Sequence, residues 1–92
     1  MRLGKERVGQ TIAHVMELPR DLVLDVPRIT MVGREEMHLE NHKGIIEYGP
    51  GHLKINLNRG YLEIYGEGLE IAVLRTEEML ITGRIQDIRF AE

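Results

Sequence analysis

The sequence predicts an all-β domain preceded by one N-terminal helix. Apolar and polar residues alternate with a period of two in residues 53–57 and 62–65, a pattern typical of strands with one buried face. Glycines divide residues 37–74 into short segments, and turn signals recur about every seven to ten residues. We therefore expect about seven short antiparallel strands in a small sandwich or a rolled sheet. A short β-solenoid is the alternative, because short strands separated by glycine also stack as coils.

The helix is expected at the start of the chain, over residues 1–18. Its apolar residues recur at helical spacing and would form one side of an amphipathic helix: Val8, Ile12, Val15 and Met16. Pro19 ends the pattern, because proline disfavours a helical conformation in the residue before it. Residues 19–92 then form the β domain, with residues 19–27 as a connector or an edge strand.

The remaining strands follow in order along the chain. Residues 28–32 form a strand that ends at Gly33, and residues 79–82 and 84–90 form the last two, separated by a turn or bulge at Gly83. Within residues 84–90, Ile85 and Ile88 have opposite parity, so an alternating strand needs a bulge or a change of face near Asp87.

Two glycine-rich triplets could be mistaken for phosphate-binding loops. They are Gly49-Pro50-Gly51 and Gly66-Glu67-Gly68. Neither precedes a predicted helix whose N-terminal amides could bind an anion, so we interpret both as hairpin turns.

The expected core consists of the apolar residues that share one face of each predicted strand. They are Ile29, Met31, Leu39, Ile46, Leu53, Ile55, Leu57, Leu62, Ile64, Leu69, Ile71, Val73, Leu80 and Ile88.

Composition narrows the possible functions. The chain has 92 residues, enough for one domain, and it has no cysteine for disulfides or thiolate metal sites. Residues 35–92 carry six Lys/Arg against eleven Asp/Glu, a balance that disfavours nucleic-acid binding. The more basic residues 1–34 could still contact an anionic membrane peripherally. The sequence has no signal peptide and no apolar run of about 20 residues, so we expect a cytoplasmic protein, and we expect no cofactor.

One constellation could support chemistry. His38, Glu40 and His42 share strand parity, and a small hydrolase or metal-binding enzyme using them is the alternative function. Positions i and i+4 of a flat strand lie about 13 Å apart, however, which is too far for two ligands of one metal ion. We therefore interpret the three side chains as a solvated strand face.

Partner binding is the favoured alternative to catalysis. Tyr61 and Tyr65 lie on the strand face opposite Leu62 and Ile64, so both should point outward, where aromatic side chains can anchor a partner. The helix offers a second surface through Val8, Ile12 and Val15. Unpaired edge strands offer a third, through which copies of the chain could form oligomers.

Long stretches of the chain resemble the YabP/YqfC family of sporulation proteins, and its YqfC branch in particular. They are Leu18-Pro19-Arg20-Asp21-Leu22-Val23-Leu24-Asp25-Val26-Pro27-Arg28-Ile29-Thr30-Met31-Val32-Gly33, Leu39-Glu40-Asn41-His42-Lys43-Gly44-Ile45 and Glu77-Glu78-Met79-Leu80-Ile81-Thr82-Gly83. The resemblance implies a protein of the mother cell of endospore-forming bacteria, without known enzymatic activity or catalytic residues. It also implies a membrane-protein partner encoded nearby, through which the protein would associate with the membrane. The expected function is thus a non-enzymatic assembly or adaptor module in sporulation.

Overall fold

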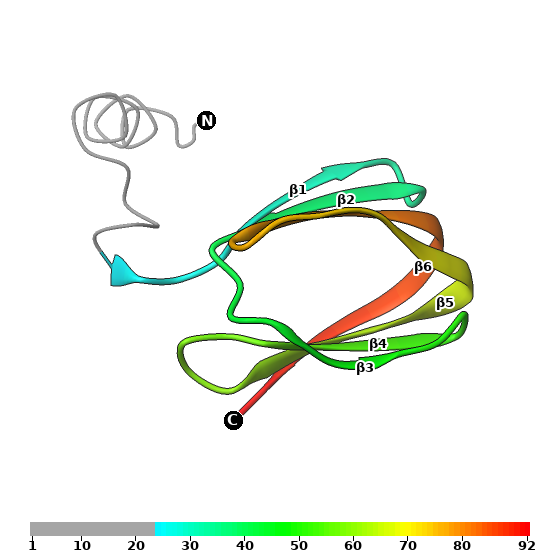
Figure 1. Ribbon diagram of the computed structural model, residues 1–92. Helices are drawn as coiled ribbons and strands as arrows, with labels where there is room; N and C mark the ends of the chain where they lie inside the picture. The colour runs from blue at the N-terminus through cyan, green and yellow to red at the C-terminus, as the bar shows by residue number, and fades with distance from the viewer. Residues whose placement is uncertain (1–23) are drawn as a thin grey trace, which may run out of the picture.

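The computed structural model describes residues 24–92, which form one six-stranded sheet (Figure 1). The strands are β1 (Arg28–Val32), β2 (Glu36–Glu40), β3 (Ile45–Tyr48), β4 (His52–Asn56), β5 (Tyr61–Leu74) and β6 (Glu78–Ala91). Their order in the sheet is β1-β2-β6-β5-β4-β3, and all neighbours are antiparallel. The all-β prediction is confirmed. The predicted helix over residues 1–18 lies outside the described residues, as does the connector before Leu24.

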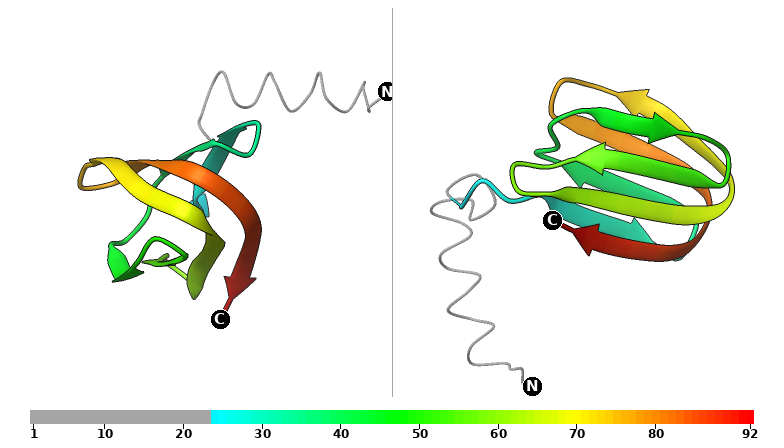
Figure 2. Two further views of the ribbon diagram at one scale, coloured as in Figure 1. Left: turned by 90° about the vertical axis from the view of Figure 1, so that its right-hand side faces the viewer. Right: turned by 90° about the horizontal axis from the view of Figure 1, so that it is seen from below.

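The sheet is rolled into two layers by the two long strands. β5 and β6 pair with each other along most of their length. β4 pairs with β5 along the first part of β5 alone, and β2 pairs with β6 along the first part of β6 alone. Both long strands bend between these regions, so that β1 and β2 come to lie opposite β3 and β4 (Figures 1 and 2). The rolled-sheet prediction therefore holds, and the solenoid alternative is wrong because stacked coils would pair in parallel.

The expectation of about seven short strands is wrong because two glycine signals lie inside strands. Gly66-Glu67-Gly68, predicted to be a hairpin turn, is part of β5, and Gly83 is part of β6. At Gly66 the backbone of β5 lies directly against the carbonyl of Arg84 on β6, an approach that a Cβ atom would block. These glycines therefore permit a sharp bend in paired strands. The other triplet is a turn as predicted, with the Gly49 N–H donating to the carbonyl of His52 at 2.9 Å.

The predicted bulge near Asp87 is present in β6. Tyr65 pairs with Asp87 and the next residue, Gly66, pairs with Ile85, so Gln86 is an extra residue in the ladder. The bulge lets Ile85 and Ile88 both point toward the core, since Ile85 is 4% exposed and Ile88 packs against the buried cluster.

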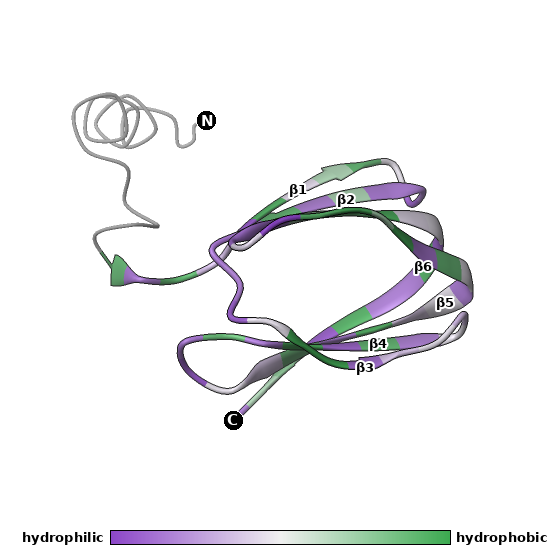
Figure 3. Cartoon of the chain, viewed as in Figure 1, coloured by the Kyte–Doolittle hydropathy of each residue, from purple (hydrophilic) through white to green (hydrophobic). Residues whose placement is uncertain are grey.

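The core lies between the two layers and consists of aliphatic and methionine side chains. Figure 3 shows hydrophobic and hydrophilic residues alternating along β4, whose hydrophobic face contributes to this core. Predicted core residues that are buried are Leu39, Leu53, Ile55, Leu57, Leu62, Ile64 and Leu69, with Ile29, Ile71 and Ile88 partly buried against them.

Four core predictions are wrong. Met31, Ile46 and Val73 are 37%, 47% and 40% exposed, and Leu80 is only partly buried and lies outside the core cluster. Leu80 pairs with His38 on the outer face, while its neighbours on either side are fully buried. A shift of one residue moves every side chain of a strand to the opposite face, which is why Met79 and Ile81 were missed together on β6. Met37, on the same face of β2 as Leu39, is a separate omission from the predicted core.

Candidate protein-interaction surface

The three residues of the alternative enzymatic site do not share one face. His38 remains on the outer face of β2, where its Nδ1 lies 3.5 Å from Glu40 and its Nε2 lies 3.3 Å from Glu78. β2 ends at Glu40, and Asn41 adopts a left-handed conformation with φ of 65° that redirects the chain. His42 is consequently 2% exposed, so its prediction as part of a solvated face is wrong.

His42 has a structural environment in which both ring nitrogens are occupied. Its Nδ1 accepts a hydrogen bond from the Gly44 N–H at 3.0 Å, so its Nε2 carries the proton and donates to the carbonyl of Arg75 at 3.2 Å. The neutral ring thereby fastens the β2–β3 connector, residues 41–44, to the loop between β5 and β6. Neither nitrogen is left to bind a metal ion or a substrate.

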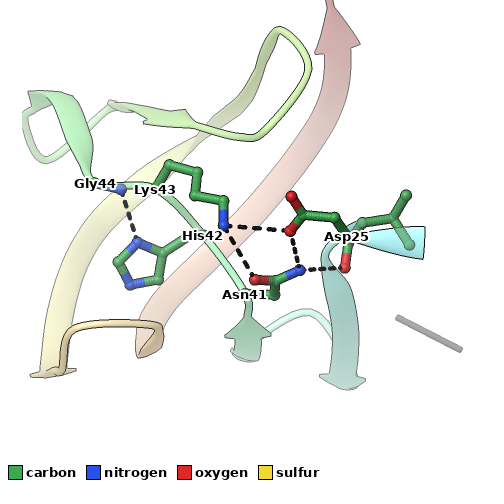
Figure 4. A network of polar contacts seen from close by, with 6 residues as sticks. Asp25, Asn41, His42, Lys43 and Gly44 are labelled. Carbon is green, nitrogen blue, oxygen red and sulfur yellow. Dashed lines mark hydrogen bonds and ion pairs between the residues drawn. The ribbon is translucent and has the colours of Figure 1, made fainter. Parts of the chain in front are cut away.

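The same connector is held by a polar network around Asn41 (Figure 4). The Asn41 side-chain amide donates to the Asp25 carboxylate at 3.1 Å and to the carbonyl of Val26 at 3.0 Å. Lys43 Nζ lies 3.2 Å from the same carboxylate. Asn41 is 6% exposed, so these bonds satisfy a buried amide. The network ties the segment that leads into β1 to the connector between the two layers.

The network makes the stability of the protein depend on pH through Asp25. The hydrogen bond from Asn41 and then that from Lys43 hold the pKa of this carboxyl below its ordinary value. Because the pKa of Asp25 is lower in the folded state, the ionised carboxylate stabilises the fold. This contribution to the free energy of unfolding is complete above the unfolded pKa of about 3.9 and is lost as the pH falls through the folded pKa. We expect Asp25→Asn to lower the melting temperature at pH 7, and the difference from wild type to shrink below about pH 4.

The matched control for Asp25 is Glu67→Gln, because the Glu67 carboxylate forms no ion pair with any described residue. The melting temperature of Glu67→Gln should change with pH in the same way as that of the wild-type protein. A difference between Asp25→Asn and wild type that stayed constant from pH 7 to pH 3 would contradict the assigned cause.

No group of three or more His, Cys, Asp or Glu residues within 24–92 is placed to hold a metal ion. The described residues also include no helix long and apolar enough to cross a membrane.

The two predicted tyrosines lie on the outer face of β5 among charged side chains. Lys54 Nζ lies 4.3 Å from the centre of the Tyr61 ring, and the His52 ring stacks on Tyr65 at 4.7 Å. His52 also contacts Glu63 at 3.1 Å. Partial burial, followed by the nearby Glu63 carboxylate, raises the pKa of Tyr65. Both rings are partly covered, so this face is a polar surface with aromatic residues in it.

A more apolar surface lies along β3, and sequence reasoning missed it. Every residue of β3 is exposed, including Ile45 at 36%, Ile46 at 47% and Tyr48 at 55%. We call these three residues the β3 edge. Among the described strands, β3 pairs only with β4, so its other side has no neighbouring strand.

Two residues of the β3 edge, Ile45 and Tyr48, belong to the core side of the sheet but are exposed. Ile45 pairs with Ile55 and Tyr48 pairs with Leu53, and both partners are fully buried. Paired residues point to the same face, so Ile45 and Tyr48 face inward where no described segment encloses them. The Tyr48 hydroxyl accepts a hydrogen bond from the Ile71 N–H at 3.0 Å, which links β3 to the second part of β5. A sequence signal was available, because residues 45–48 contain three large apolar residues and neither the lysine nor the proline that often protects an edge.

Comparison with known proteins places this fold in a family. The model of the YabP family matches residues 25–92. The chain is 34% identical over 88 residues to the uncharacterized protein YqfC of Bacillus subtilis (strain 168), covering 96% of this chain and 95% of that protein. No solved structure matches the chain. The resemblance expected from the sequence is therefore confirmed, and the chain belongs to the YabP family.

Proposed function

We propose that this protein is a non-enzymatic assembly module of sporulation, which binds a partner chain in the mother cell through the β3 edge. The observation that supports the proposal is the exposure of Ile45, Ile46 and Tyr48 on a strand with one free side. Family membership supports the setting, because the resemblance implies a sporulation protein with a membrane-protein partner.

Strand addition is the binding mode that suits this edge. A free edge presents backbone N–H and C=O groups that another extended segment can pair with, and apolar side chains beside it add buried area. The β3 edge offers both, since Ile45 and Tyr48 face the core side and Ile46 lies at the register irregularity between Ile45 and Glu47. The partner segment would extend the layer formed by β3, β4 and the first part of β5. The polar face around Tyr61 and Tyr65 remains a second predicted contact.

The proposal is tested by placing a positive charge on the edge. Ile46→Lys should abolish co-purification with the membrane protein encoded beside this gene, because lysine on an edge strand opposes further pairing. The fold should persist, since Ile46 is 47% exposed. The matched control is Val32→Lys on β1, at the other end of the sheet, where the side chain is 62% exposed.

Light scattering on the wild-type, Ile46→Lys and Val32→Lys proteins measures their oligomeric state, and together with co-purification it separates the outcomes. Loss of binding by Ile46→Lys alone supports the proposal. A wild-type protein that stays monomeric and captures no partner, or an Ile46→Lys variant that binds as wild type does, would exclude it. Self-association that Ile46→Lys removes would identify a second copy of the chain as the partner.

A further inference from the structure

A second uncovered apolar surface lies at the opposite edge of the same layer, around Phe90. A cavity of about 410 Å³ opens there, and its apolar lining comes from Val26, Pro27, Leu57 and Phe90. Phe90 is the single phenylalanine of the chain and is 64% exposed. It pairs with Leu62, which is fully buried, so the Phe90 ring belongs to the core side of β6.

The exposed area continues along the segment that enters β1. Val26 is 42% exposed and Leu24 is 56% exposed, and Val26 itself lines the cavity. We call Leu24, Val26 and Phe90 the Phe90 surface. Among the described residues, no strand pairs with the outer side of β6 after its first part, so this surface has no cover from the sheet. An exposed aromatic ring beside a cavity marks a place where another apolar segment can pack.

We propose that the Phe90 surface is covered by residues 5–18 of the same chain, docked through Val8, Ile12, Val15 and Met16. The first argument is the position of the tether. The 23 residues outside the described part end at Val23, directly before Leu24 of the Phe90 surface, so they start beside the surface that they would cover. About ten residues separate Met16 from Val26, a span of at most roughly 36 Å, and a tether this short gives an effective concentration in the millimolar range.

The second argument is chemical complementarity. The apolar residues of 5–18 recur at helical spacing, and a helix this short is marginal in water unless its apolar side is covered. The cavity at the Phe90 surface offers the apolar side chains of Val26, Pro27, Leu57 and Phe90, and Asp25, Arg59 and Glu92 complete its lining. Residues 5–18 carry two Lys/Arg against two Asp/Glu, so the segment brings no net charge to the contact.

Docking at the Phe90 surface leaves the β3 edge free. In the layer formed by β3, β4 and the adjoining parts of β5 and β6, β3 and β6 are the two opposite edges. The N-terminal segment would thus close one edge of this layer, and the other would remain open to a partner. The inference does not depend on the proposed function, because the two surfaces share no residue.

The absence of cysteine permits a direct test in the full-length protein. Arg59, which lines the cavity, is changed to Cys together with Ile12→Cys, and the double variant is oxidised mildly. We expect an intramolecular disulfide at a yield roughly tenfold or more above that of the control pair, Ile12→Cys with Glu47→Cys on β3. Val8→Cys and Val15→Cys, each paired with Arg59→Cys, give further measurements in case one geometry is unsuitable.

A charge at the surface provides the second measurement. Phe90→Glu in the cross-linking variant should reduce disulfide formation to the level of the control pair, because the apolar contact is lost. Leu74→Glu, at a side chain that is 55% exposed and lies outside the cavity, should leave the yield unchanged. Equal yields with Arg59→Cys and Glu47→Cys, or insensitivity to Phe90→Glu, would overturn the proposal. Disulfides formed only between chains would also overturn it, since the occupant would then be a second copy.

Discussion

Gly66→Ala is expected to destabilise the protein by about 4 kcal/mol or more, because it places a Cβ atom inside the bend of the sheet. That atom would overlap the carbonyl oxygen of Arg84 and would lie 3.0 Å from the Leu69 side chain. The backbone has little freedom to move away. The Gly66 N–H donates to the carbonyl of Gly51 at 3.1 Å, and Gly66 pairs with Ile85 across the ladder.

Gly49→Ala is the matched control for Gly66→Ala. A Cβ atom at Gly49 would meet nothing closer than the His52 carbonyl oxygen at 3.7 Å, which is ordinary contact. Its cost should stay within about 0.5 kcal/mol, as for most exposed substitutions. Urea unfolding of the two variants measures the difference, and similar midpoints would show that β5 and β6 do not approach each other as closely as described.

The bend at Gly66 also explains why the sequence predicted more strands than the six found within residues 24–92. A glycine in a hairpin turn and a glycine in a bent, paired strand give the same local signal, since both exploit the missing Cβ. Gly49-Pro50-Gly51 and Gly66-Glu67-Gly68 look alike in the sequence. The first joins β3 to β4, whereas the second lies inside β5 and is paired with β6. β6 begins only at Glu78, so local pattern could not distinguish the two.

Strand faces could be predicted where apolar residues truly alternate. Leu53 and Ile55 on β4, and Leu62 and Ile64 on β5, are buried as their parity indicated, and this also placed Tyr61 and Tyr65 on the outer face. Residues 79–81 are three apolar residues in a row, so parity was ambiguous there. The pairing of Leu80 with His38 decides it, and that pairing joins segments about forty residues apart, beyond the reach of local pattern.

The candidate surfaces depend on topology in the same way. Ile46 was assigned to the core as an apolar residue on one face of its strand, yet the order of the sheet makes β3 an edge. His42 shared parity with His38, but the left-handed conformation of Asn41 turned it inward. Asparagine before the histidine was a weak signal for this turn, because asparagine tolerates positive φ better than most residues.

Ile55→Ala is expected to destabilise the protein by about 2–5 kcal/mol, the range for truncating a buried isoleucine. Ile55 is fully buried in the middle of β4, where it pairs with Leu62 on one side and with Ile45 on the other. Lys54→Ala is the control on the adjacent position, which faces outward. The contact between Lys54 and the Tyr61 ring, at 4.3 Å, is partly exposed. Lys54→Ala should therefore lower the free energy of unfolding by at most about 1 kcal/mol.

The size of the Ile55→Ala effect within this range reports on the β3 edge. The cost of a core truncation depends on how far neighbouring atoms can collapse into the space that it leaves. Leu62 is enclosed on β5, but Ile45 is 36% exposed and has room to move. If urea unfolding of Ile55→Ala gives an unchanged m value and a loss of stability near the lower end of the expected range, β3 shifts inward to fill the space. A loss near the upper limit would show that the edge is held rigidly, as by the hydrogen bond from Ile71 to Tyr48. A loss no greater than that of Lys54→Ala would contradict the burial of Ile55 between the layers.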